Sequence, residues 1–200
     1  MHMLFSRPVL LAALVGTVAM FFYGATEWFN PLLHRPYQLP PNPESFNQQL
    51  AASVPGEGIF VWPQGSETHN ADGTISQPQY FLVKRTAEYY QPGRFMAVEL
   101  IGQFVTWWLV AFLMLRLGLR THRERTGLAL ALAGFVGLGY FLPMWNWWGF
   151  PTDYVLTRWI NLAIGWTLAG AAAAWALGWA AQRGRRDART VNPILAEAIR

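Results

Sequence analysis

Residues 154–181, YVLTRWINLAIGWTLAGAAAAWALGWAA, decide the fold of this chain. Arg158 is the single charged residue in the stretch. A helix needs roughly 20 predominantly apolar residues to cross the hydrocarbon core of a bilayer, and this stretch is longer than that. It therefore predicts a membrane-spanning helix.

Three other segments have the same character. Residues 127–145 carry no charge, and residues 100–115 are also uncharged and reach spanning length when 95–99 are included. Residues 8–25 form an uncharged run that is longer than the apolar region of a cleaved signal peptide, so we expect an uncleaved first helix. The four segments predict an all-α membrane protein, a four-transmembrane-helix bundle.

These segments also predict the organisation of the chain. Residues 1–25 hold a cytoplasmic N-terminus and the first helix, and residues 26–94 form a long loop. Residues 95–182 contain helices two to four, and residues 183–200 form a basic tail.

The composition agrees with a membrane protein and excludes several kinds of site. Apolar types make up 53% of the residues and charged types 13%, about half of the roughly 25% that is usual in soluble domains. Cysteine is absent, which excludes disulfides, thiolate metal sites and cysteine nucleophiles. Tryptophan occurs 11 times, often near the predicted helix ends, where an indole ring prefers to sit.

Positive charge predicts the orientation, because arginine and lysine accumulate in short cytoplasmic segments. The arginines near the predicted inner ends of the helices are Arg7, Arg116, Arg120, Arg123, Arg125, Arg183, Arg185, Arg186, Arg189 and Arg200. In loop 26–94, by contrast, acidic residues outnumber basic ones. We therefore expect both termini on the cytoplasmic side of a bacterial inner membrane and loop 26–94 on the extracytoplasmic side. His122 is accordingly expected to be a solvated cytoplasmic residue.

The same placement explains the net charge of +4 without a nucleic-acid partner, because no compact basic domain is available to hold a duplex. The expected partner of the basic tail is the lipid bilayer, whose anionic headgroups attract arginine.

Loop 26–94 predicts a small extracytoplasmic α+β cap between helices one and two. Residues 42–44 (Asn-Pro-Glu) are typical of a helix start, and residues 55–56 (Pro-Gly) end that helix. Residues 59–62 and 79–86 are short runs of β-branched and aromatic residues, which pair most simply as an antiparallel hairpin with a long connection. A segment of this size forms at most a marginally stable core of its own, so we expect it to pack against the membrane surface or against a partner.

The loop also carries a resemblance to known proteins. The residues that carry it are Trp28, Pro31 and His34, then Pro43-Glu44, and then Gly58-Ile59-Phe60 with Pro63. This pattern resembles a family of uncharacterised four-span bacterial inner-membrane proteins. Those proteins leave their first helix through a tryptophan, proline and histidine cluster and have a glycine, aromatic and proline strand further on. The resemblance implies the four-span topology and no activity.

A polar cluster is predicted inside the membrane, near the outer surface. Glu99 interrupts an apolar run, and Gln103 lies four positions on, on the same helical face. Arg158 enters the fourth span at a similar depth, with Asn161 near the same face. Because an acid in a membrane is costly and usually faces the bundle interior, we expect Glu99 and Arg158 to form an ion pair between helices two and four. The alternative is that Glu99 accepts protons or binds a ligand.

A second set of polar groups is expected at the outer face: Glu27, His34 and Asp153. A zinc site needs three or four convergent ligands, and one histidine with scattered acids does not provide them, so no metal is predicted. No cofactor is predicted either. For the deeper tryptophans, Trp107, Trp108 and Trp166, contact with lipid, quinone or pigment is an open interpretation.

The leading functional hypothesis is a non-catalytic accessory or assembly subunit of a larger inner-membrane complex, with other membrane subunits or further copies of the chain as partners. Ionisable residues in the spans are few, helix faces of small residues are abundant, and no nucleophile elbow, phosphate loop or dinucleotide fingerprint is found. One alternative is a membrane enzyme or transporter that uses Glu99 and Arg158. Another is a pigment- or quinone-contacting subunit of a respiratory or photosynthetic complex.

Overall fold

The structure is a computed structural model that describes residues 4–27, 29–30, 40–54, 56, 58–62, 68–69, 72, 75–76, 80–84 and 91–191. It contains four helices that are long and apolar enough to cross a membrane. They are α1 (Arg7–Glu27), α4 (Pro92–Arg116), the span His122–Asn146 that begins with α5 (His122–Val136), and α7 (Thr152–Val191). The predicted set of four apolar helices is confirmed, and it indicates a membrane-embedded protein.

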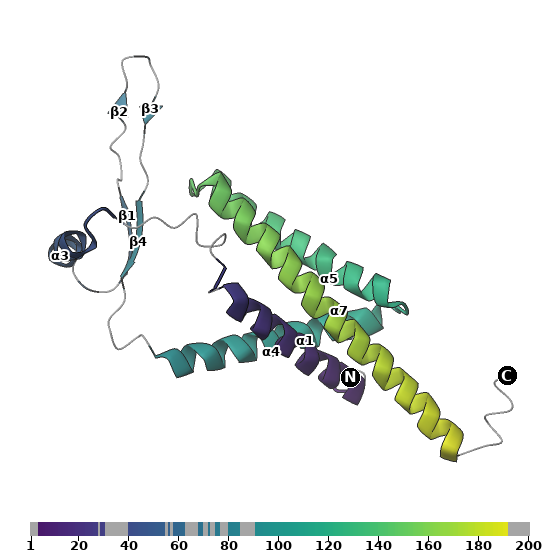
Figure 1. The fold of residues 1–200 in the computed structure, drawn as a ribbon. Helices are drawn as coiled ribbons and strands as arrows, with labels where there is room; N and C mark the ends of the chain where they lie inside the picture. Colours follow the sequence, from purple (N-terminus) through teal and green to yellow (C-terminus); the bar gives the residue numbers. More distant parts are fainter. Residues whose placement is uncertain are drawn as a thin grey trace.

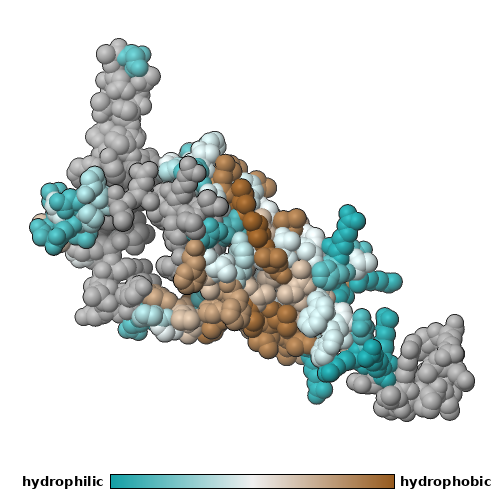
Figure 2. Space-filling view, viewed as in Figure 1, coloured by the Kyte–Doolittle hydropathy of each residue, from teal (hydrophilic) through white to brown (hydrophobic). Residues whose placement is uncertain are grey.

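The helices are arranged around α7. α7 lies along both α1 and α5, and α1 also packs against α4 (Figure 1). The buried cluster draws on all four helices and consists of Val9, Ala12, Trp107, Val110, Ala111, Met114, Ala129, Ala169, Ala173, Ala176 and Leu177. Alanine is frequent in this cluster, which allows the backbones to approach closely. Figure 2 shows an apolar band across the helices and hydrophilic groups toward the end of α7.

Two glycines permit the closest helix contacts. A side chain at Gly170 of α7 would collide with the Cβ atom of Ala129 on α5. At Gly16 of α1, a Cβ atom would lie 2.9 Å from ring carbons of Trp107, which α4 contributes. These two contacts are possible because glycine has no side chain at either position.

The third span is not a uniform α-helix. After α5 the chain forms a π-helical turn, η2 (Gly137–Phe141), and then the short α6 (Leu142–Asn146). Pro143 lacks an N–H group, and its ring would meet the carbonyl of Gly139 in a regular α-helix. A widened turn is one way for a helix to relieve this conflict, and the prediction of a plain span over 127–145 did not include it.

Loop 26–94 contains short elements that lie apart from the four long helices (Figure 1). α3 (Pro43–Ser53) begins as predicted, with the Asn42 side chain accepting a hydrogen bond from the Ser45 N–H at 3.1 Å. β1 (Gly58–Trp62) pairs antiparallel with β4 (Tyr80–Lys84), which confirms the predicted hairpin. Within its connection, β2 (Thr68–His69) pairs antiparallel with β3 (Ile75–Ser76), a ladder that was not predicted.

A packed α+β cap is not supported, and this prediction requires correction. No residue of α3 is buried, and its aromatic residue Phe46 is exposed. In the described part of the loop, α3 therefore shares no core with the strands. Its apolar stripe is too narrow to bury much surface, and a helix of 11 residues is marginally stable without such packing.

The helix boundaries also differ from the prediction at three ends. α1 continues to Glu27, α4 begins at Pro92 rather than near residue 95, and α7 continues to Val191, well into the predicted tail 183–200. Pro92 suits the first helical turn, because the missing N–H group would have no helical acceptor there.

Candidate functional site

The predicted polar cluster is divided between two places. Asn161 of α7 is buried, with 7% of its surface exposed, and it is bonded to α1 rather than to α4. The Tyr23 hydroxyl donates to the Asn161 Oδ1 atom at 2.5 Å and lies 3.3 Å from the Asn161 carbonyl oxygen. One turn further along α7, the Tyr23 ring lies against Gly165. Tyr23 and Asn161 therefore fasten α1 to the N-terminal half of α7.

Glu99 and Gln103 form the other part of the cluster, on α4. The Gln103 Nε2 atom donates to the Glu99 Oε1 atom at 2.8 Å, as their spacing of four residues predicts. Glu99 is exposed. Its described contact is with its own helix, so the structure does not form the expected ion pair with Arg158.

Arg158 and Asp153 lie near the start of α7. The guanidinium carbon of Arg158 lies 5.8 Å from the centroid of the Tyr154 ring, one turn before it. The Asp153 Oδ1 atom accepts a hydrogen bond from the Tyr154 N–H at 2.8 Å, at the helix start. Glu27 ends α1, with its backbone alone described, and His34 lies outside the described residues. The structure therefore does not test the predicted outer set as a group.

The Tyr23 contact gives a first prediction. Replacing Tyr23 with Phe keeps the ring on Gly165 and removes the hydrogen bond to Asn161, so we expect the protein to be destabilised by about 0.6 kcal/mol and by no more than ~1.7 kcal/mol. Thermal unfolding in detergent measures this. The control is Tyr140→Phe, because the Tyr140 ring is exposed. An equal loss of stability in both variants would contradict the assigned role of the hydroxyl.

Arg125 forms a contact that the sequence pattern did not indicate. The sequence counts it among the arginines that predict the orientation, and in the structure it is buried, with 8% of its surface exposed. Its Nε atom donates to the Leu119 carbonyl at 3.0 Å, and its Nη1 atom donates to the Ala174 carbonyl of α7 at 3.4 Å. Burial of the guanidinium is tolerated because backbone carbonyls accept its hydrogen bonds.

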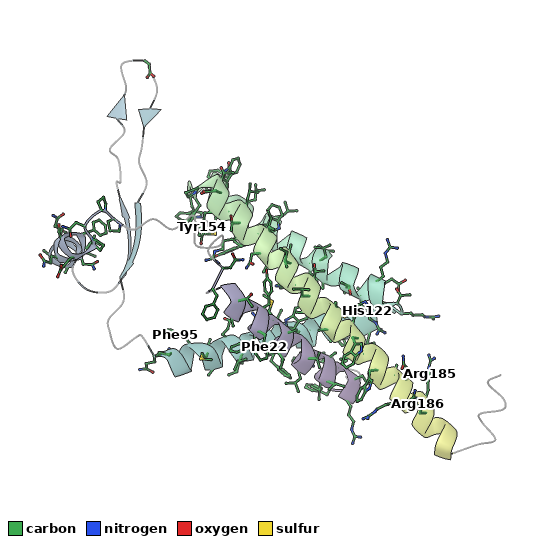
Figure 3. The ribbon with its side chains drawn as sticks, in the orientation of Figure 1. Phe22, Phe95, His122, Tyr154, Arg185 and Arg186 are labelled. Carbon is green, nitrogen blue, oxygen red and sulfur yellow. The ribbon has the colours of Figure 1, made fainter. Side chains whose placement is uncertain are left out.

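His122 reinforces the same junction. It is exposed as expected, yet its Nε2 atom lies 3.1 Å from the Ala171 carbonyl of α7, one turn from Ala174. In Figure 3, His122 is labelled at the N-terminal end of α5, beside α7. His122 and Arg125 thus fasten the beginning of α5 to two successive turns of α7.

The turn before α5 places Arg125. α4 ends in a Schellman motif, in which the Gly118 N–H donates to the Leu115 carbonyl at 3.0 Å and the Leu119 N–H donates to the Met114 carbonyl at 3.1 Å. Gly118 has a φ of +68°, a conformation that suits glycine. Thr121 and Glu124 then form a capping box that starts α5. The Leu119 carbonyl is consequently within reach of Arg125.

The deep tryptophans contact protein. Trp107 is fully buried, with its ring centroid 5.7 Å from that of Trp166. The Trp108 Nε1 atom donates to the Leu4 carbonyl at 2.8 Å. Trp107 therefore does not offer its ring to a quinone, pigment or acyl chain, since the neighbouring helices cover it.

Neither the comparisons with known proteins nor the described side chains identify a reaction or a ligand. Comparison of the chain with protein-family models, curated proteins and solved structures finds no match. Within the described residues, no group of three histidine, cysteine or acidic side chains is arranged to hold a metal ion. Tyr23, Asn161, His122 and Arg125 join helices to one another. Glu99 differs from them, because it is an exposed acid in the N-terminal half of α4.

Proposed function

We propose that the protein is a non-catalytic accessory subunit of a larger membrane complex, and that it binds a partner helix through the outer half of α4. The single observation that carries this proposal is the exposure of that half of α4 on all its sides. Met96 and Val98 are two residues apart, on opposite sides of the helix, and have 51% and 63% of their surfaces exposed. From Trp107 onward, in contrast, α4 contributes to the buried core.

One residue of this exposed surface, Glu99, is poorly suited to contact with lipid. Glu99 lies seven residues into α4, about 10 Å along the helix axis from its start. A carboxylate at that depth is costly in contact with acyl chains and requires water or a hydrogen-bonding neighbour. Gln103 donates a hydrogen bond to only one of the two Glu99 carboxylate oxygens. A partner helix with hydroxyl, amide or basic side chains would supply the remaining donors.

The orientation belongs to the same proposal. The arginine-rich ends, Arg7 and residues 183–200, are placed on the cytoplasmic side of a bacterial inner membrane, and loop 26–94 is placed outside. The helix and strands of loop 26–94 would then lie on the same side of the membrane as the start of α4. They would form a common core only in contact with the partner.

Site-specific photo-crosslinking in native membranes tests the proposal. A photo-crosslinking amino acid in place of Met96, which is exposed and lies one turn before Glu99 on the same side of α4, is expected to give an adduct with a discrete protein other than this chain. The same group in place of Leu130, which is exposed on α5, is the control and is expected to give no such adduct. An adduct of twice the chain mass, or no protein adduct at Met96, would overturn the proposal.

A second variant tests the role of the carboxylate. In a Glu99→Gln background, the Met96 adduct should fall roughly tenfold or more, because loss of one member of a buried charged contact costs about 2 kcal/mol or more. Gln has nearly the same shape as Glu, so the fold should be kept, and gel filtration in detergent checks this. An undiminished adduct would show that Glu99 does not hold the partner.

A further inference from the structure

The long end of α7 carries a feature that the accessory role does not use. α7 has 40 residues and is about 60 Å long, twice the roughly 30 Å of a bilayer core. Its last turns continue past the ends of α1 and α5 (Figure 1). Residues 181–186 are exposed. The change from an apolar to a basic helix therefore falls where α7 leaves the apolar band.

One face of this region combines tryptophan with arginine. Trp175, Trp179, Arg183 and Arg186 follow one another at spacings of four, four and three residues, which places them on one side of a helix. We call these four residues the Trp–Arg stripe. Trp175 and Trp179 have 60% and 37% of their surfaces exposed, whereas Ala173 and Leu177 on the opposite side are buried. The stripe therefore faces away from the other helices.

Within the stripe, Trp179 positions Arg183. The guanidinium carbon of Arg183 lies 4.0 Å from the centroid of the Trp179 ring, a close cation–π stacking distance. Stacking orients the planar guanidinium and leaves its N–H donors at the edge available. No acceptor for them is found among the described residues. A guanidinium held in this way fits the oxygens of a phosphate, which it binds through two parallel hydrogen bonds.

The surroundings determine which phosphate would reach Arg183. Trp175 and Trp179 are amphipathic rings of the kind that lie at the level of lipid headgroups, and Arg183 and Arg186 follow them toward water. Arg185 and Arg186 both project from this last part of α7 (Figure 3). An anionic headgroup would contact the guanidinium while its acyl chains lie beside the indole rings. We propose that the Trp–Arg stripe is a binding site for the phosphate of an anionic glycerophospholipid.

The proposal predicts a difference between two neighbouring arginines. Arg183 lies on the stripe, whereas Arg185 lies about 200° further around the helix, at 100° per residue. Arg183→Gln and Arg185→Gln change the net charge equally. We expect Arg183→Gln to weaken binding of phosphatidylglycerol roughly fivefold and Arg185→Gln to change it less than twofold. Native mass spectrometry of the full chain, titrated with phosphatidylglycerol in neutral detergent, measures the bound lipid.

Three further measurements separate the proposal from general attraction of charge. Trp179→Leu keeps every arginine and is expected to weaken lipid binding about as much as Arg183→Gln. Phosphatidylcholine should bind weakly to all variants, and inorganic phosphate should not compete with phosphatidylglycerol at millimolar concentration. Circular dichroism confirms that each variant is folded. Equal weakening by Arg183→Gln and Arg185→Gln, unchanged binding in Trp179→Leu, or full competition by inorganic phosphate would each overturn the proposal.

Discussion

Replacing Gly170 with Ala is expected to lower the thermal stability of the protein sharply, because the new methyl group meets the Cβ atom of Ala129 on α5. That atom is fixed to the backbone, so a change of side-chain rotamer cannot relieve the contact. Separating two packed helices to admit a methyl group typically costs 1–3 kcal/mol. In a chain of this size each kcal/mol corresponds to a fall of roughly 2–4 °C in Tm. Thermal unfolding in detergent measures the effect.

A second substitution isolates the cause. Ala129→Gly removes the opposing methyl group, so the double variant Gly170→Ala with Ala129→Gly should regain most of the lost stability. Gly178→Ala is the control on the same helix, because a side chain there meets no atom within 4 Å. If the double variant were no more stable than Gly170→Ala alone, the close contact between α5 and α7 would not be the reason for the glycine.

Removing Arg125 is expected to have the second large effect. Arg125→Ala leaves the partly buried carbonyl of Leu119 without its donor and removes the buried bond to the Ala174 carbonyl. Hydrogen bonds to a charged group are worth about 1.5–3 kcal/mol, so we expect a loss of stability in this range. α5 should also separate from α7 more readily, which limited proteolysis between residues 118 and 122 would detect.

The control for Arg125 is its neighbour Arg123. Arg123 is exposed, so Arg123→Ala removes the same charge from the same turn with little loss of packing. Arg125→Lys keeps the charge but cannot reach both carbonyls with a rigid fork, so its stability should fall between that of the wild type and that of Arg125→Ala. Equal stability of the Arg123→Ala and Arg125→Ala variants would contradict the role of Arg125 in holding α5 against α7.

The sequence predicted the helical framework because its signals are local. An uncharged run of sufficient length predicts a spanning helix without reference to any other segment, and all four runs correspond to helices. The start of α3 was predicted correctly for the same reason, since the Asn42 cap and Pro43 lie next to each other in the chain. The pairing of β1 with β4 also followed from two short apolar runs separated by turn residues.

The contacts between helices were not predictable in the same way. Asn161 was predicted to lie in one cluster with Glu99 and Arg158, but its partner is Tyr23 of α1, because the sequence does not show which helices are neighbours. Arg125 looked like any other arginine of an inner loop. Its burial depends on the carbonyls of Leu119 and Ala174, which are backbone atoms and leave no mark on the sequence. Pro143 was the one local signal for the π-helical turn.

Labelling of single cysteines tests the four-crossing arrangement most directly, and the natural chain contains no cysteine to interfere. A membrane-impermeant maleimide is applied to intact and to permeabilised cells that carry Ser45→Cys, Arg120→Cys, Trp147→Cys or Arg185→Cys. We expect positions 45 and 147 to react in intact cells, and positions 120 and 185 to react only after permeabilisation. Reaction of position 185 from outside, or protection of position 45 in intact cells, would contradict a chain that crosses the membrane four times with both ends inside.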